Sequence, residues 1–119
     1  MKRDMDLIRD ILLKIEGDPS LDGTRYTEYT EVDFPEHSRQ EIFYHMDLLF
    51  EAQLTDGAPS MHAPCVSRLT WDGHEFLAAI KDPGVWNKTK ERAKGAAMLT
   101  LPIIIEIAKQ EMKKHLGLP

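Results

Sequence analysis

This sequence of 119 residues has a single cysteine and no long apolar run. Cys65 cannot form an internal disulfide, which is typical of proteins in a reducing compartment. No stretch approaches the ~20 apolar residues that a membrane helix requires. The opening MKRDMDLIRDILL interrupts its apolar pairs with Asp or Arg, whereas a secretory signal needs a continuous apolar region. We therefore expect a cytoplasmic protein that does not enter the membrane.

The residue groupings that most enzymes use are also missing. Asp72 and His74 stand close together, but no nucleophile, glycine-rich phosphate loop or carboxylate pair accompanies them. His62 and Cys65 have the two-residue gap found in zinc sites, yet no second pair with matching spacing follows. We expect no enzymatic activity, no cofactor and no metal.

Length and composition indicate one globular domain. The chain is 42% apolar and 29% charged, which is typical of a globular protein, and its size suits a single core. We predict one domain over residues 1–119, with a folded core at 1–81 and a C-terminal helical extension at 82–119.

The charges are distributed unevenly along the chain. Residues 1–80 hold 7 Lys and Arg against 16 Asp and Glu, whereas residues 81–119 hold 8 against 4. A protein that binds DNA normally concentrates Lys and Arg on its recognition surface, because these side chains neutralise phosphates. The acidic first part is therefore a poor match to DNA.

Two helices are predicted in the first half. A helix over about 3–16 carries one apolar stripe and stops before Gly17; the stripe consists of Met5, Ile8, Ile11, Leu12 and Ile15. Ser38 and Glu41 have the spacing of a capping box and begin a helix that reaches about Ala52. Its predicted core face is Ile42, Met46, Leu49 and Phe50.

Between these helices, TRYTEYTEVDF favours a short strand near Tyr26–Val32. The remaining residues leave room for only one helical turn, near Pro35–Ser38. A strand beginning at Leu54, a loop containing GAPSMHAP and a returning strand with Val66 and Leu69 predict a β-hairpin with a long tip.

Three more helices follow the hairpin. Thr70 can cap the first, which ends near Lys81 and in which Gly73 allows the close approach of a neighbouring segment. Asp82 and Pro83 begin a second helix, which runs to Gly95 with Trp86 as its anchor in the core. A last helix starts near Thr100, and its apolar stripe is Leu101, Ile104, Ile105, Ala108, Met112 and Leu116.

Helix, strand, helix, two-stranded wing and helix is the element order of a winged helix-turn-helix, which presents the helix before the wing to the major groove. We therefore predict a mainly α fold of the α+β class: a winged helix-turn-helix-like domain with a small β-hairpin wing and a C-terminal helical extension. The helix that normally supports the recognition helix has little sequence left to form it.

Two local stretches and the whole chain resemble known families. FYHMDLLFEAQLTD and RLTWDGHEFL are similar to the end of the recognition helix and to the exit from the wing in bacterial winged-helix regulators. Across most of the chain, MKRDMDLIRDIL, YHMDLL, LTWDGHEFL and VWNKTKE resemble a domain-of-unknown-function family of bacteria, phages and prophages. The resemblance implies a winged-helix-like fold and a phage or mobile-element setting, without catalytic residues. Gln53 departs from the family, in which glycine usually follows the helix, and a left-handed conformation there would cost roughly 1 kcal/mol.

The residues facing outward from the helix at 38–52 are the first candidates for a binding site. Arg39 and Gln40 are suited to reading base edges, whereas Phe43 and Tyr44 suit either a base or a protein partner. Asp47 repels phosphate. Together with the wing tip, the candidates for nucleic-acid or partner binding are Arg39, Gln40, Phe43, Tyr44, Asp47, Met61 and His62.

A second set of candidates consists of basic residues at helical spacing. Lys88, Lys90, Arg92 and Lys94 could contact phosphates, although a solvated helix face has the same pattern. Two functions remain open: a DNA-linked transcriptional regulator that binds double-stranded DNA, or an adaptor or phage factor that binds and modulates a host or phage protein. Ile103 and Ile107 lie off the main stripe of the last helix, so a homodimer through that helix is a further expectation.

Overall fold

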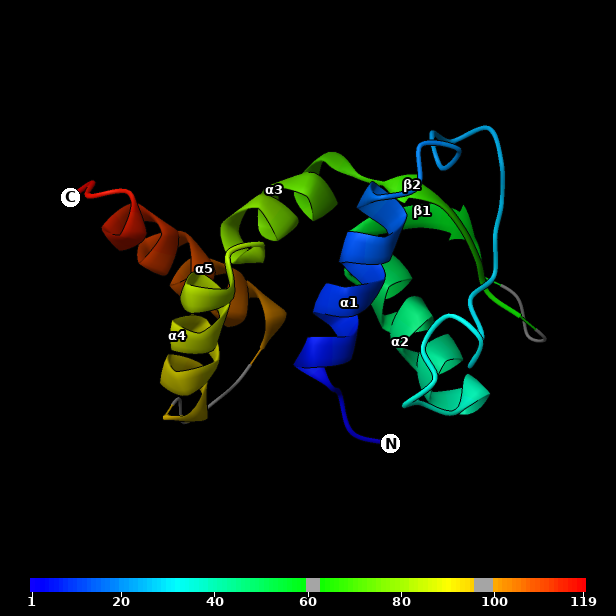
Figure 1. The fold of residues 1–119 in the computed structure, drawn as a ribbon, viewed down its shortest axis with the longest axis horizontal. Helices are drawn as coiled ribbons and strands as arrows, with labels where there is room; N and C mark the ends of the chain where they lie inside the picture. Colours follow the sequence, from blue (N-terminus) through cyan, green and yellow to red (C-terminus); the bar gives the residue numbers. More distant parts are fainter. Residues whose placement is uncertain (60–62, 96–99) are drawn as a thin grey trace. The chain divides into compact units, whose positions relative to one another are not determined.

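The computed structural model describes residues 1–59, 63–95 and 100–119. These residues form two compact units, Met1–His74 and Glu75–Pro119. The elements, shown in Figure 1, are α1 (Met5–Glu16), α2 (Arg39–Glu51), β1 (Thr55–Ala58), β2 (Cys65–Leu69), α3 (Trp71–Ile80), α4 (Pro83–Lys94) and α5 (Leu101–His115). The predicted fold class is confirmed: the chain is mainly helical with one small antiparallel sheet, an arrangement compatible with a winged helix. No helix in the described ranges is long and apolar enough to cross a membrane.

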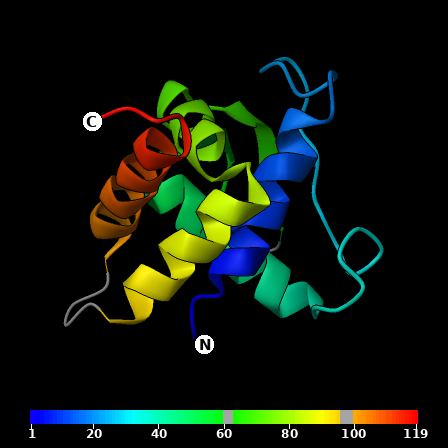
Figure 2. The same ribbon diagram turned by 60° about the vertical axis from the view of Figure 1, so that its left-hand side comes forward.

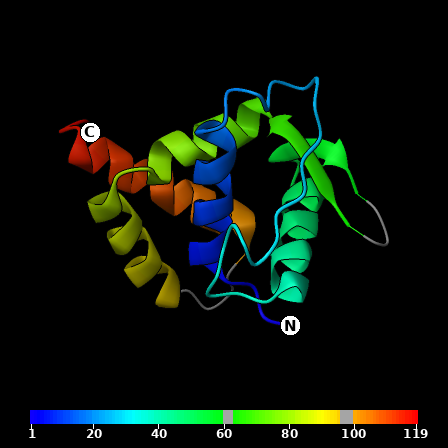
Figure 3. The same ribbon diagram turned by 45° about the vertical axis from the view of Figure 1, so that its right-hand side comes forward.

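Helix α1 is stabilised by an N-cap at its start and by the burial of one apolar face. The Asp4 side chain accepts hydrogen bonds from the backbone N–H groups of Asp6 and Leu7, which satisfies the first turn. The buried face matches the predicted stripe from Ile8 onward and packs against α2 and β2, as Figure 3 shows. The helix begins at Met5 rather than at Arg3, because Asp4 is its N-cap.

The predicted strand near Tyr26–Val32 is wrong as a full strand. Among the residues that the structure describes, this segment forms one antiparallel bridge, between Thr27 and Val66 of β2, with N···O distances of 2.9 and 2.8 Å. Beyond it the chain turns. The Asp33 carboxylate accepts a hydrogen bond from the backbone N–H of Thr30, and the backbone N–H groups of Asp33 and Phe34 donate to the carbonyl oxygen of Thr30. Residues 17–38, all of which are described, contain no helix, as expected from the short sequence left for a supporting helix.

The β-hairpin is confirmed and follows α2 directly. Thr55 pairs with Leu69, and the register shifts between Asp56 and Gly57. Gly57 permits this close pairing, because an added Cβ would lie 2.0 Å from the carbonyl oxygen of Cys65. Gln53, before the hairpin, has a φ of 60°, so this position adopts the left-handed conformation without a glycine.

Helix α3 starts tightly against the hairpin. The hydroxyl of Thr70 accepts from the N–H of Gly73 at 3.0 Å and donates to the carbonyl oxygen of Gln53 at 2.7 Å. A Cβ at Gly73 would lie 2.0 Å from the carbonyl oxygen of Leu54, so the predicted close approach at this glycine is confirmed.

The second unit contains α4 and α5, which lie side by side, as Figure 2 shows. Asp82 caps α4 and Trp86 is buried, as predicted. Arg92 joins the helices by donating to Glu111 and to Gln110, each at 2.9 Å. The predicted stripe of α5 is only partly buried: Leu116, at its end, is 61% exposed. Ile104 and Ala108 are buried. Glu111 is also buried, although it was not part of the predicted stripe.

Candidate functional site

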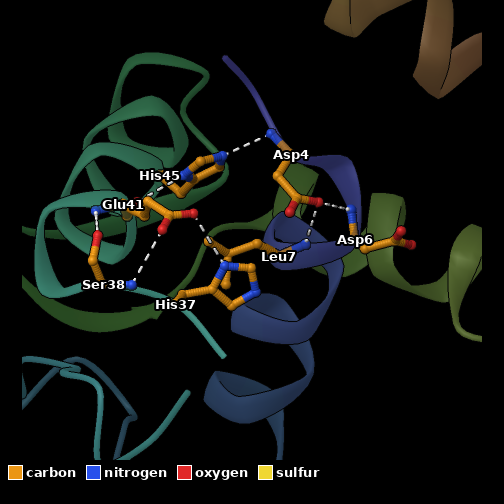
Figure 4. Close-up of polar contacts among 7 residues, drawn as sticks. All are labelled: Asp4, Asp6, Leu7, His37, Ser38, Glu41 and His45. Carbon is orange, nitrogen blue, oxygen red and sulfur yellow. Dashed lines mark hydrogen bonds and ion pairs between the residues drawn. The ribbon is translucent and has the colours of Figure 1, made fainter. Parts of the chain in front are cut away.

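Helix α2 is held at its start by the predicted capping box, drawn in Figure 4. The Ser38 hydroxyl accepts from the N–H of Glu41 at 3.1 Å, and the Glu41 carboxylate accepts from the N–H of Ser38 at 3.2 Å. The other carboxylate oxygen lies 3.3 Å from Nδ1 of His37. The Ser38 backbone hydrogen bond, followed by His37, lowers the pKa of Glu41. The carboxylate therefore favours its charged form at the helix start, where the helix dipole also stabilises it.

His45 fixes the middle of α2 against α1. It is 1% exposed, its Nδ1 lies 2.7 Å from the carbonyl oxygen of Glu41, and its Nε2 lies 2.7 Å from the backbone nitrogen of Asp4 (Figure 4). A neutral ring satisfies both contacts: Nδ1–H donates to Glu41, and Nε2 accepts from Asp4.

His45 was not among the residues predicted to be buried or functional. The signal was present, because His45 follows Ile42 by three positions and so belongs to the buried face with Met46 and Leu49. Phe50, which was predicted for that face, is only half-buried.

The outward side of α2 carries most of the predicted recognition residues. Gln40 and Glu51 are exposed, and Phe43 and Asp47 are half-buried. The Tyr44 ring is 36% exposed and lies edge-on to the His45 ring at 5.4 Å between centroids. We call Gln40, Phe43, Tyr44, Asp47 and Glu51 the α2 face. It is an aromatic and acidic surface on a helix whose opposite side is anchored.

Arg39 is the only Lys or Arg residue in α2, and it is already paired. Its Nε and Nη2 atoms donate to the two carboxylate oxygens of Glu31, at 3.2 and 3.0 Å. This contact is bidentate, the strongest geometry for an arginine and a carboxylate. Its donors therefore point toward the turn segment that precedes α2.

Asp47 experiences an unfavourable electrostatic environment. Partial burial raises the pKa of its carboxyl group, and the negative charge of Glu51 raises it further. A positive charge placed near Asp47 would oppose the effect of Glu51 and lower the pKa of the Asp47 carboxyl group.

The wing contributes less to a basic surface than a DNA-binding wing normally does. Arg68 on β2 forms an ion pair with Asp56 on β1. Met61 and His62, predicted at the wing tip, lie outside the described residues. No group of three His, Cys, Asp or Glu side chains within residues 1–59, 63–95 and 100–119 is arranged to hold a metal ion.

The four basic residues of α4 do not form one surface. Lys88 and Arg92 share one side of the helix, whereas Lys90 and Lys94 lie on the other, as their spacing requires. The Lys90 ammonium lies 5.6 Å from the Trp86 ring, and Arg92 is paired with Glu111. Lys88 and Lys94 are exposed.

The chain is a mainly helical α+β protein whose first unit is compatible with a winged-helix-like arrangement. Residues 2–99 match the family model described as "Hypothetical protein (DUF2513)", and the chain belongs to this family. A protein of Haemophilus influenzae described as "Uncharacterized protein" is 34% identical over 122 residues, which is 98% of this chain and 100% of the relative. No solved structure matches the chain. The predicted membership of a domain-of-unknown-function family is confirmed.

Proposed function

We propose that this protein is a noncatalytic, cytoplasmic adaptor that binds another protein through the α2 face. The partner, a host or phage protein, presents basic side chains around an apolar centre. The phage or mobile-element setting rests on the family resemblance noted in the sequence.

The observation that carries this proposal is the pairing of Arg39 with Glu31. It occupies the one cation of α2, so the α2 face presents Asp47 and Glu51 without a neighbouring positive charge on the same helix. The unit Met1–His74 as a whole holds 7 Lys and Arg against 15 Asp and Glu, a formal charge of −8. Such a surface repels phosphates and attracts basic proteins.

The aromatic residues give the same surface its apolar part. Exposed tyrosines on a rigid support are frequent anchors of protein interfaces, because they bury much area and lose little conformational entropy. The support here is the buried His45 ring beneath Tyr44. A partner cation beside Asp47 also lowers the raised pKa of that carboxyl group and so gains binding energy.

The experiment is photocrosslinking in cells with the full chain carrying a photoreactive amino acid at Gln40. We expect one dominant crosslinked protein, which binds the purified chain in titrations that weaken as salt is added. Tyr44→Ala and Asp47→Lys should each weaken that binding by about tenfold or more, without changing the melting temperature by more than a few degrees.

The matched control is Glu91→Lys, which makes the same charge change on an exposed position of α4. It should bind the crosslinked protein as the unaltered chain does. Equal binding by all three variants would show that the α2 face is not the docking surface.

Binding of double-stranded DNA is a second candidate, favoured by the element order. An extended segment bridged to β2 precedes α2, and the hairpin follows it directly, as in a winged helix-turn-helix. In this alternative, Arg39 leaves Glu31 to contact a base.

Anisotropy titrations with mixed-sequence duplex DNA at two salt concentrations test this alternative. Micromolar or tighter binding that falls steeply with salt, and that Glu31→Gln strengthens by releasing Arg39, supports a DNA-linked regulator. No binding at low salt by either the unaltered chain or the variant excludes it.

A further inference from the structure

A groove of about 440 Å³ lies between α3 and α5 within the second unit. Its apolar lining consists of Ala78, Ala79, Met112 and Leu116. Ala79 is buried at 6% exposure, but Ala78 and Leu116 are exposed and Met112 is half-buried, so the chain itself leaves this part of the apolar surface uncovered. Exposed aliphatic side chains beside a hollow of this size are typical of an interface.

The apolar residues of α5 explain why the groove exists. The apolar stripe predicted from the sequence extends further along α5 than its buried part. Ile104 and Ala108 are buried, whereas Met112 is half-buried and Leu116 is exposed. The second half of the stripe therefore forms one wall of the groove. Burying this wall against a second surface would be favourable, because it removes apolar area from water.

The charges of the groove have opposite signs on its two helices. Glu75 stands on α3, and Lys109 and Lys113 stand on α5. A partner surface with one sign of charge would be attracted by one helix and repelled by the other. In an interface with two-fold symmetry, both copies present both signs of charge. The acidic helix of each copy can then face the basic helix of the other, so that two attractive contacts form and none is repulsive.

We infer that this groove is a self-association surface, filled by a second copy of this chain. In the dimer, Glu75 of each copy lies beside Lys109 and Lys113 of the other. Leu116 of each copy packs on the exposed Ala78 of the other, so the second copy completes the groove. This surface belongs to the second unit and is independent of the α2 face.

The test is sedimentation velocity on the full chain across micromolar concentrations. The unaltered chain should form a concentration-dependent dimer. Glu75→Lys alone makes both helices of the groove positive, and Lys109→Glu with Lys113→Glu makes both negative, so each variant by itself should dimerise at least about tenfold more weakly. Mixing the two variants places opposite charges together again on both sides and should restore a dimer.

The matched control combines Lys88→Glu with Lys94→Glu, which makes the same charge change on exposed positions of α4 and should leave the dimer intact. Circular dichroism melts of all variants separate loss of dimer from loss of folding. The inference is overturned if the unaltered chain is a monomer throughout, if the mixture does not dimerise, or if the α4 control weakens the dimer as much as the groove variants do.

Discussion

The Nε2 atom of His45 accepts a hydrogen bond from the backbone N–H of Asp4 at 2.7 Å, across 41 positions of sequence. The same Asp4 caps α1 with its side chain, and the other nitrogen of His45 is bonded within α2. One buried ring therefore sets the start of α1 against the helix that carries the α2 face.

His45→Phe tests this contact. The phenyl ring fills a similar space but leaves the N–H of Asp4 without its acceptor, so the free energy of unfolding should fall by about 1–3 kcal/mol in urea denaturation. Tyr44→Ala, at the more exposed neighbouring position, should cost less. An equal loss in the two variants would show that the hydrogen bond contributes nothing beyond local packing.

Gln53→Gly should stabilise the first unit. The backbone at this position has a φ of 60°, where a side chain is strained and glycine is not. We expect a gain of up to about 1 kcal/mol in the free energy of unfolding, reduced by the greater freedom of glycine in the unfolded chain. The control is Ala52→Gly at the adjacent C-cap, whose φ of −78° suits any residue, and there the change should destabilise.

Gly73→Ala should destabilise despite the higher helix propensity of alanine. The added methyl group would meet the backbone carbonyl of Leu54, which cannot move without disturbing the hairpin. A loss of about 1–3 kcal/mol or more is expected from thermal or urea denaturation. Gly95→Ala, where the nearest atom would be 3.7 Å away, is the control and should change stability little. A neutral result at Gly73 would contradict the close packing of α3 on Leu54.

Arg92→Met should destabilise the second unit in a way that depends on pH. The hydrogen bond from Arg92 is the largest cause of the lowered pKa of Glu111, and Lys114 adds to it. A carboxyl group whose pKa is lowered by folding stabilises the folded state above its unfolded pKa, and this contribution is lost as pH falls through the folded pKa.

The difference in unfolding free energy between the unaltered chain and Arg92→Met should therefore be largest near neutral pH, at roughly 1 kcal/mol, and should shrink in acid. Lys114→Met is the control. Its ammonium lies 3.6 Å from Glu111 and is more exposed, so the same titration should show a smaller effect. A difference that does not change with pH would mean that Arg92 acts through packing alone.

The sequence alone predicted α1 to α5 and the β-hairpin, because their signals are local. Capping residues such as Ser38 and Asp82 and the apolar stripes act within one or two turns of their own helices. Helical periodicity likewise predicted the outward residues of α2, and the small size of glycine predicted the close approach at Gly73. It failed where an element depends on a distant partner: the segment near Thr27 pairs only where the edge of β2 is available to it.

What only the tertiary structure decided is how these side chains are used. Glu31 and Arg39 are far enough apart in sequence that their pairing depends on the turns between them, and it engages with a carboxylate an arginine that the sequence predicted to read bases. The role of His45 also depends on folding, because only the folded chain brings the backbone N–H of Asp4 within hydrogen-bonding distance of its ring. The sequence determined the main buried stripe of each helix, since periodicity is a property of the single helix, although Phe50 and Leu116 are less buried than their stripes predict. The folded chain decided which charges remain available, since ion pairs and buried hydrogen bonds require residues that only folding brings together.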